Sequence, residues 1–177
     1  MRKVLLLLVV IVLVIFLSNC GESLTDKQLY EKAQKYENEE NAELAIKFYE
    51  KLVSDYSQSK LAPEALFRIA VVAAGFQKNL EKSIEAYTRL VSKYPDSEFA
   101  PKSQFMIGYI YANEIKDYDE AKKAYNLFLE KYADVDSGMT ASAKFELKNM
   151  GKDISNIDFL KDLAEKETSN KKEAKGN

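Results

Sequence analysis

The side chains that most often perform enzyme chemistry are scarce in this chain of 177 residues, which has no histidine and a single cysteine, Cys20. Histidine is the commonest general acid–base group and metal ligand, and one thiol forms neither an intramolecular disulfide nor a cysteine-rich metal site. Paired carboxylates such as Asp117 and Asp119 stand at the start of a helical pattern, where they cap a helix. The sequence therefore predicts a protein that is not an enzyme and that holds no cofactor and no metal.

Charge and composition limit the classes of partner and of fold that we expect for this chain. Lys and Arg number 26 and Asp and Glu 28, a formal net charge of -2, which gives no electrostatic reason to expect nucleic-acid binding. Hydrophobic residues make up 46% of the chain, enough for a folded core. Only 6 Gly and 3 Pro are present, too few for the many turns of a β-protein, so long helices are favoured.

Cys20 lies where an export signal would end. Two basic residues, Arg2 and Lys3, precede an apolar run from Val4 to Leu17, which is too short for a comfortable membrane span and typical of a signal peptide. The following stretch, Leu17-Ser18-Asn19-Cys20-Gly21, resembles the lipobox of bacterial lipoproteins. This resemblance implies a signal peptide over 1–19, a lipid on Cys20 and a short linker over 20–24. Because Asn19 departs from the small residue usual there, two alternatives stay open, namely an uncleaved N-terminal anchor and an ordinary signal peptide in which Cys20 has no role.

The remaining chain repeats itself with a period of 38 residues. Two series of tyrosines mark the repeat, namely Tyr49, Tyr87 and Tyr125, and Tyr56, Tyr94 and Tyr132. In the third copy the spacing from Ser103 to Ala143 is 40, which indicates a two-residue insertion between Ala133 and Met139. Repeats of this length are typical of stacked supersecondary units.

Within each unit the apolar residues have helical spacing, as in Ile84, Tyr87, Val91 and Tyr94. No stretch alternates with period two, so the predicted fold is all-α. Thr25, Asn41, Asn79 and Asp117 are the candidate helix N-caps. The predicted helices cover 25–38, 42–56, 61–76, 80–94, 98–114, 118–132 and 139–150, with a shorter one from about 156 to 166.

Paired helices of this length resemble tetratricopeptide repeats, most clearly in Phe105-Met106-Ile107-Gly108-Tyr109 followed by Asp117-Tyr118-Asp119-Glu120-Ala121. The fuller phrase Tyr94-Pro95-Asp96-Ser97, with Ala100-Pro101 after it, resembles BamD-type outer-membrane assembly lipoproteins and the repeat domain of the YbgF or CpoB proteins associated with Tol-Pal. The resemblance implies a right-handed α-solenoid of about three helix pairs over 25–151. A C-terminal capping helix over 152–165 and a disordered charged tail over 166–177 would follow.

By resemblance, the first helix of each pair lines the concave surface that holds a partner. The matching residues are Tyr36, Glu64, Phe67, Val71, Lys102, Phe105, Tyr109 and Asn113, with Leu29 and Ala33 in the N-terminal helix. Such a groove would be apolar and aromatic with few charges, suited to an extended peptide or a partner helix. The alternative for the aromatic residues is that they belong to the core. Phe67 and Phe105 occupy positions where chaperone-binding repeats clamp a C-terminal carboxylate, so that activity is not expected.

These observations predict a non-enzymatic scaffold for protein–protein interaction in the bacterial cell envelope. Its lipid would tether it to the outer membrane facing the periplasm, because Gly21 rather than Asp follows the cysteine. The resemblance implies a role in outer-membrane protein assembly or in Tol-Pal and envelope coordination. The alternative is an accessory or self-associating envelope lipoprotein without a dedicated peptide groove.

Overall fold

The computed structural model describes residues 23–152, and within this range it is entirely helical. The helices are α2 (Asp26–Asn38), α3 (Ala42–Asp55), α4 (Ala62–Gly75), α5 (Leu80–Lys93), α6 (Phe99–Tyr109), the π-helical segment η1 (Ile110–Ile115), α7 (Tyr118–Tyr132) and α8 (Ser137–Asn149). The predicted all-α fold is confirmed. The expected signal peptide, Cys20, the capping helix beyond 152 and the charged tail lie outside the described residues.

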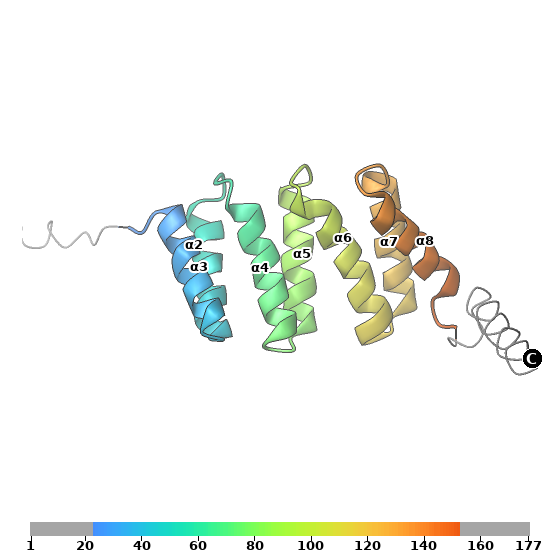
Figure 1. Cartoon of the computed structure of the whole chain (residues 1–177), viewed down its shortest axis with the longest axis horizontal. Helices are drawn as coiled ribbons and strands as arrows, with labels where there is room; N and C mark the ends of the chain where they lie inside the picture. The colour runs from blue at the N-terminus through green and yellow to red at the C-terminus, as the bar shows by residue number, and fades with distance from the viewer. Residues whose placement is uncertain (1–22, 153–177) are drawn as a thin grey trace, which may run out of the picture.

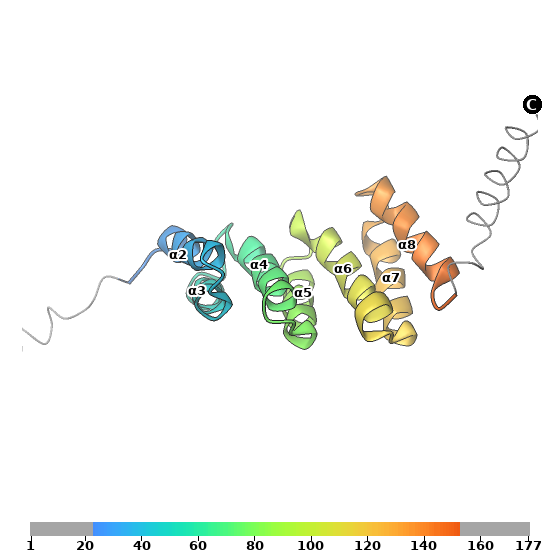
Figure 2. The same ribbon diagram turned by 60° about the horizontal axis from the view of Figure 1, so that its bottom comes forward.

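The helices form two layers. One layer holds α2, α4, α6 and α8, and the other holds α3, α5 and α7 (Figures 1 and 2). Each helix packs against the next in the chain, so that α2–α3, α4–α5 and α6–α7 are three successive pairs, to which α8 adds a last helix. This is the stacking of a tetratricopeptide-like α-solenoid. The outer surface of α2, α4, α6 and α8 is called the A-face below, and that of α3, α5 and α7 the B-face.

The turn inside each pair is built the same way three times. Asn41, Asn79 and Asp117 cap the second helices, each accepting a hydrogen bond from the backbone N–H three residues later. One residue ahead of each cap, Glu40, Lys78 and Lys116 adopt left-handed backbone conformations with φ of 57°, 55° and 65°. A left-handed residue ends the first helix and redirects the chain. The predicted caps, including the capping box of Thr25 with Gln28, are confirmed.

The two tyrosine series have separate structural roles. The hydroxyls of Tyr56, Tyr94 and Tyr132 donate to the backbone carbonyls of Leu24, Ser57 and Pro95, which ties the end of each second helix to an earlier loop. The rings of Tyr49, Tyr87 and Tyr125 are buried between the layers and are at most 2% exposed. The periodicity therefore reports both the core and the links between successive repeats.

Two predicted helices differ from the observed ones. The helix expected over 98–114 changes to a π-helical turn at Ile110 and ends before Lys116. The helix expected from 139 begins at Ser137, because the Asp136 side chain accepts a hydrogen bond from the backbone N–H of Met139 and so caps it two residues earlier. The insertion between Ala133 and Met139 thus supplies the cap of α8.

Replacing Ser103 with alanine should raise the free energy of unfolding by about 1 kcal/mol. Ser103 is fully buried in α6 and its Oγ has no hydrogen-bond partner among the described residues. A buried hydroxyl without a partner is destabilising, and alanine removes it with little change in volume. The same position holds Ala65 and Ala143 in the neighbouring repeats, both fully buried. Urea unfolding followed by circular dichroism measures the change.

The matched control is Ser142→Ala on α8. Ser142 is exposed and its hydroxyl donates to the carbonyl of Gly138, so its loss should change stability by less than about 0.5 kcal/mol. Destabilisation by Ser103→Ala would show that its hydroxyl is satisfied in the folded protein.

Candidate functional site

Several residues predicted for the partner groove lie in the core instead. Leu29 and Ala33 are fully buried between α2 and its neighbours, so their assignment to the groove is wrong. Phe67 is 9% exposed and packs against the rings of Tyr87 and Phe99 at centroid distances of 5.6 and 5.5 Å. Helical spacing alone does not distinguish the side of a first helix that faces its partner from the side that faces solvent.

The aromatic residues of α6 divide between the core and the surface. Phe105 is half-buried and contacts the rings of Tyr125 and Phe128 at 5.3 and 5.8 Å. Tyr109, one turn further on, is 39% exposed on the A-face. The backbone carbonyl of Tyr109 accepts a hydrogen bond from the Asn113 side chain, which holds Asn113 beside it. The A-face therefore offers Tyr109, rather than Phe105, to a partner.

The other predicted groove residues take part in local contacts. Tyr36 stacks on Phe48 with ring centroids 5.4 Å apart, and the Glu64 carboxylate accepts a hydrogen bond from the Tyr30 hydroxyl. The ammonium of Lys102 lies 5.3 Å from the centre of the Phe67 ring. The remaining residue, Val71, is half-buried among the residues packed on the core.

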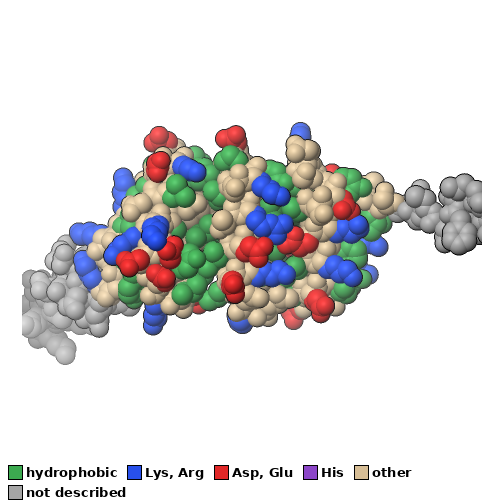
Figure 3. Space-filling view, turned by 180° about the vertical axis from the view of Figure 1, so that it is seen from behind, with side chains coloured by type: hydrophobic (Ala, Val, Ile, Leu, Met, Phe, Trp, Pro, Cys, Tyr) green, Lys and Arg blue, Asp and Glu red, His purple; other side chains and the backbone are tan. Residues whose placement is uncertain are grey.

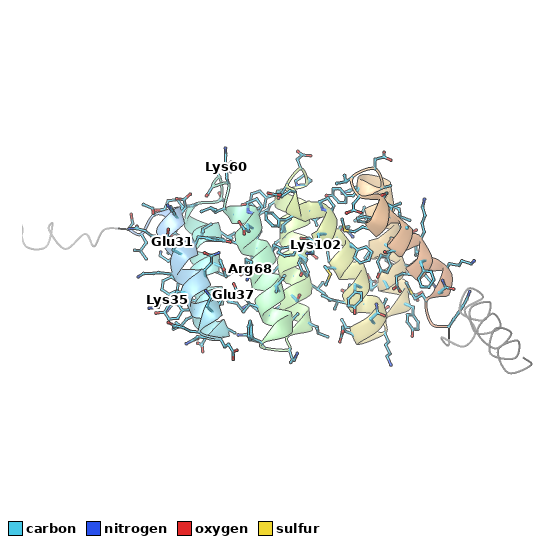
Figure 4. All side chains as sticks on the ribbon, viewed as in Figure 1. Glu31, Lys35, Glu37, Lys60, Arg68 and Lys102 are labelled. Atoms are coloured by element: carbon cyan, nitrogen blue, oxygen red, sulfur yellow. The ribbon has the colours of Figure 1, made fainter. Side chains whose placement is uncertain are left out.

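The expectation of a groove with few charges is wrong for the first half of the A-face. Figure 4 shows Glu31, Lys35, Glu37 and Arg68 together on α2 and α4. Glu37 is only 8% exposed, and its carboxylate accepts hydrogen bonds from Nε and Nη2 of Arg68. The Tyr49 hydroxyl donates to the same carboxylate at 2.9 Å. A polar network thus closes the A-face between the first and second repeats.

One repeat later, the same positions leave a hollow. Gly75 stands at the place of Glu37 and Met106 at that of Arg68, each 38 residues on. A pocket of about 350 Å³ lies here between α4 and α6. A Cβ built on Gly75 would meet nothing within 4 Å. Its lining includes Gly75, Lys78, Ser83, Tyr87, Met106 and Tyr109, and it is called the Gly75 pocket below.

Two hydroxyl groups border the Gly75 pocket, those of Ser83 and Tyr87. Ser83 is fully buried and its Oγ makes no hydrogen bond. Tyr87 lies one turn further along α5 and is 2% exposed, and its hydroxyl lacks the carboxylate that Tyr49 finds in Glu37. Burial raises the pKa of Tyr87 to about 12, so this hydroxyl stays protonated and able to donate at neutral pH.

The interface between the third repeat and α8 also lacks a polar network like that of Glu37, Arg68 and Tyr49. Asn113 and Glu146 hold the positions of Glu37 and Arg68, and the fully buried Tyr125 hydroxyl has no partner among the residues described. Burial raises the pKa of the Glu146 carboxyl group. An amide and a carboxylate thus stand at the two positions that form an ion pair at the first interface. The ion pair is therefore not repeated here.

The B-face repeats this difference. Between α3 and α5, the Arg89 guanidinium donates two hydrogen bonds to the Glu50 carboxylate at 2.7 and 2.9 Å. Between α5 and α7 the equivalent residues are Thr88 and Leu127, and both line a pocket of about 540 Å³. Figure 3 shows hydrophobic side chains exposed on this face between groups of charged ones. The interface between the second and third repeats is therefore open on both faces.

Sequence reasoning missed Gly75, Ser83, Tyr87 and Met106 as a site, although the signal was present. The repeats place comparable positions 38 residues apart, and a departure from the other copies is informative at such positions. The Gly75 pocket arises because Gly75 and Met106 differ from their counterparts Glu37 and Arg68 one repeat earlier. Within residues 23–152 no group of acidic residues could hold a metal ion, and no helix is long and apolar enough to cross a membrane.

Comparison with known families agrees with the observed helix pairs. The family model described as tetratricopeptide repeat matches residues 64–97 and 102–134, which correspond to α4–α5 and α6–α7. No curated protein matches the chain. The pair α2–α3 has the same architecture without a family match of its own. The chain thus contains tetratricopeptide repeats at two positions, and such repeats typically bind protein partners as non-catalytic scaffolds.

Proposed function

We propose that this protein is a membrane-tethered scaffold of the bacterial cell envelope that binds a segment of a partner protein on its A-face, across α4 and α6. The observation that carries the proposal is the Gly75 pocket beside the exposed ring of Tyr109. An exposed aromatic side chain next to an unfilled pocket is typical of the anchor points in peptide-binding surfaces. The first half of the A-face offers no equivalent, because Glu37 and Arg68 occupy that space.

The N-terminal sequence is the basis for proposing a location in the cell envelope. The lipobox resemblance around Cys20 supports a lipid anchor, and Gly21 supports the outer membrane facing the periplasm. The repeat phrase supports a role in outer-membrane protein assembly, as in BamD-type proteins, or in Tol-Pal and envelope coordination, as in YbgF-type proteins. Metabolic labelling with palmitate should label the wild-type protein and not Cys20→Ala if the cysteine carries the anchor, and an unlabelled wild-type protein in the membrane fraction would favour the uncleaved N-terminal segment.

A second candidate is an accessory lipoprotein that self-associates or binds through the B-face. The observation that favours it is the larger pocket between α5 and α7, which is lined by Thr88, Ile107 and Leu127 among others. Apolar lining exposed on a surface is a common feature of interaction sites.

Site-specific photocrosslinking distinguishes the two candidates. A photoreactive residue would replace Tyr109 on the A-face, Leu127 on the B-face or Val135, which is 64% exposed in the loop before α8. Specific capture of one partner from position Tyr109 supports the A-face scaffold. The same partner should be captured by a photoreactive group at Lys102, and Tyr109→Glu should abolish that capture. Capture from Leu127 alone favours the second candidate. Equal capture from all three positions would contradict a defined binding surface.

A further inference from the structure

We propose that the Gly75 pocket receives a carboxylate side chain, from a Glu or Asp of the bound segment. This inference rests on the proposed A-face function and names the chemistry of its anchor. The protein itself shows the arrangement one repeat earlier, where the Glu37 carboxylate accepts a hydrogen bond from the Tyr49 hydroxyl at 2.9 Å. At the second interface the tyrosine is retained as Tyr87, and the carboxylate is absent because Gly75 has no side chain.

The donors of the Gly75 pocket fit an acceptor. Ser83 and Tyr87 are four residues apart on α5, so their side chains lie on the same face of the helix. The Ser83 hydroxyl is buried without a hydrogen-bond partner among the described residues, and the Tyr87 hydroxyl borders the pocket without the carboxylate that Tyr49 has in Glu37. A buried hydroxyl without a partner is destabilising, so an acceptor that reaches Ser83 relieves a cost that the folded protein already carries.

The charge at the pocket favours a carboxylate over a neutral amide. Lys78 borders the pocket, held there by the left-handed turn between α4 and α5, and it makes no ion pair with any residue between 23 and 152. Glu114 also lines the pocket, and its carboxylate offsets part of the attraction that Lys78 exerts on an incoming negative charge. The Arg68 position is Met106, so Lys78 takes the role of the cation and Met106 contacts the methylene groups of the incoming side chain. A carboxylate between a lysine and two hydroxyls has its charge and its lone pairs satisfied.

The test compares three peptides that differ at one residue. Each is a nonapeptide with the same flanks, one of which contains tryptophan, and with Glu, Gln or Leu at its centre. The chain contains no tryptophan, so the fluorescence anisotropy of the peptide reports its binding without background. The full-length protein is used in detergent micelles, and empty micelles give the correction for peptide partitioning. The Glu peptide should bind at least tenfold more tightly than the Gln and Leu peptides.

Four variants locate the binding. Tyr87→Phe and Lys78→Gln should each reduce the preference for Glu over Gln to less than about threefold, and both leave the fold intact because they remove only an unpartnered hydroxyl or an exposed charge. Gly75→Glu should abolish binding, because it places the chain's own carboxylate in the pocket. The matched control is Tyr49→Phe, which removes the equivalent hydroxyl at the first interface. It should leave peptide binding unchanged.

The outcomes separate this inference from the proposed function. Equal binding of the Glu and Gln peptides would overturn the carboxylate assignment, and a Glu preference that survives both Tyr87→Phe and Gly75→Glu would overturn its location. If no peptide binds while crosslinking from Tyr109 still captures a specific partner, the A-face scaffold stands and the carboxylate anchor is wrong. If no partner is captured from Tyr109, the scaffold proposal fails whatever the peptides show.

Discussion

Replacing Arg68 with methionine, the residue that holds the same position one repeat later, should lower the free energy of unfolding by about 2–3 kcal/mol. The Glu37 carboxylate is 8% exposed, and Arg68 is its only cationic partner in the part of the chain that the structure describes. Without the guanidinium, a buried charge would be left with the Tyr49 hydroxyl alone. Removing one partner of a buried ion pair costs about 3–5 kcal/mol, and the partial exposure of Arg68, 37%, reduces this.

A double variant separates the lost charge from lost packing. Glu37→Gly combined with Arg68→Met reproduces the pair found at Gly75 and Met106, and it should recover part of the stability because no buried carboxylate remains. The glycine in α2 and the loss of the acceptor of Tyr49 keep the double variant below the wild type. Arg89→Met on the B-face is the matched single variant. Its partner Glu50 is 33% exposed, so the cost should be about 1 kcal/mol. Equal losses for Arg68→Met and Arg89→Met in urea unfolding would show that burial of Glu37 has no special importance.

The junction between the first and second repeats and the junction between the second and third repeats differ in how completely they are filled. Nearest-neighbour contacts determine the stability of a repeat array, so one junction can be strengthened without changing the others. Ion pairs at Glu37–Arg68 and Glu50–Arg89 link the first repeat to the second on both faces. At the next junction neither pair is present, and unfilled space remains on both faces. The first junction therefore supports the structure, and the second is available to a ligand.

Most of the fold could be predicted because it depends on local signals. The caps at Asn41, Asn79 and Asp117 and the buried tyrosine of each pair recur at one spacing, and helices follow from such patterns wherever packing agrees with them. The π-helical turn at Ile110 could not be predicted, since it depends on how α6 continues across its neighbours. The cap at Asp136 lies within the insertion, where the repeat gives no register.

The site was harder to predict because it depends on the absence of a side chain at Gly75. Phe67 and Tyr109 are both aromatic residues of a first helix and were both predicted to line the groove, yet one is 9% and the other 39% exposed. Which of them reaches solvent depends on the packing between repeats, and a single helical pattern does not contain that information. Gly75 has no side chain to suggest a function. Its significance appears only when the space above it is compared with the space that Glu37 fills.

Replacing Gly108 with valine should lower the free energy of unfolding by about 3 kcal/mol, and with alanine by about 1 kcal/mol. An ideal Cβ at Gly108 would lie 2.8 Å from both Cδ1 and Cε1 of Tyr125. The Tyr125 ring is fully buried and also contacts the Phe105 ring at 5.3 Å, so it has little room to move aside. Overpacking of a core costs about 1–3 kcal/mol, and alanine offsets part of this by its better helix propensity.

The comparison with neighbouring glycines and repeats makes the cause of this loss testable. Gly75→Ala lies in a helix with nothing within 4 Å of its Cβ, and it should raise stability by about 0.5 kcal/mol. The second repeat has Ala70 where the third has Gly108, so a Cβ is accommodated at this position in one repeat and would clash with Tyr125 in the other. A second change that shrinks the facing ring, Tyr125→Leu, should therefore reduce the cost of Gly108→Ala. An unchanged cost would mean that the glycine is needed for its backbone and not for the space that it leaves to Tyr125.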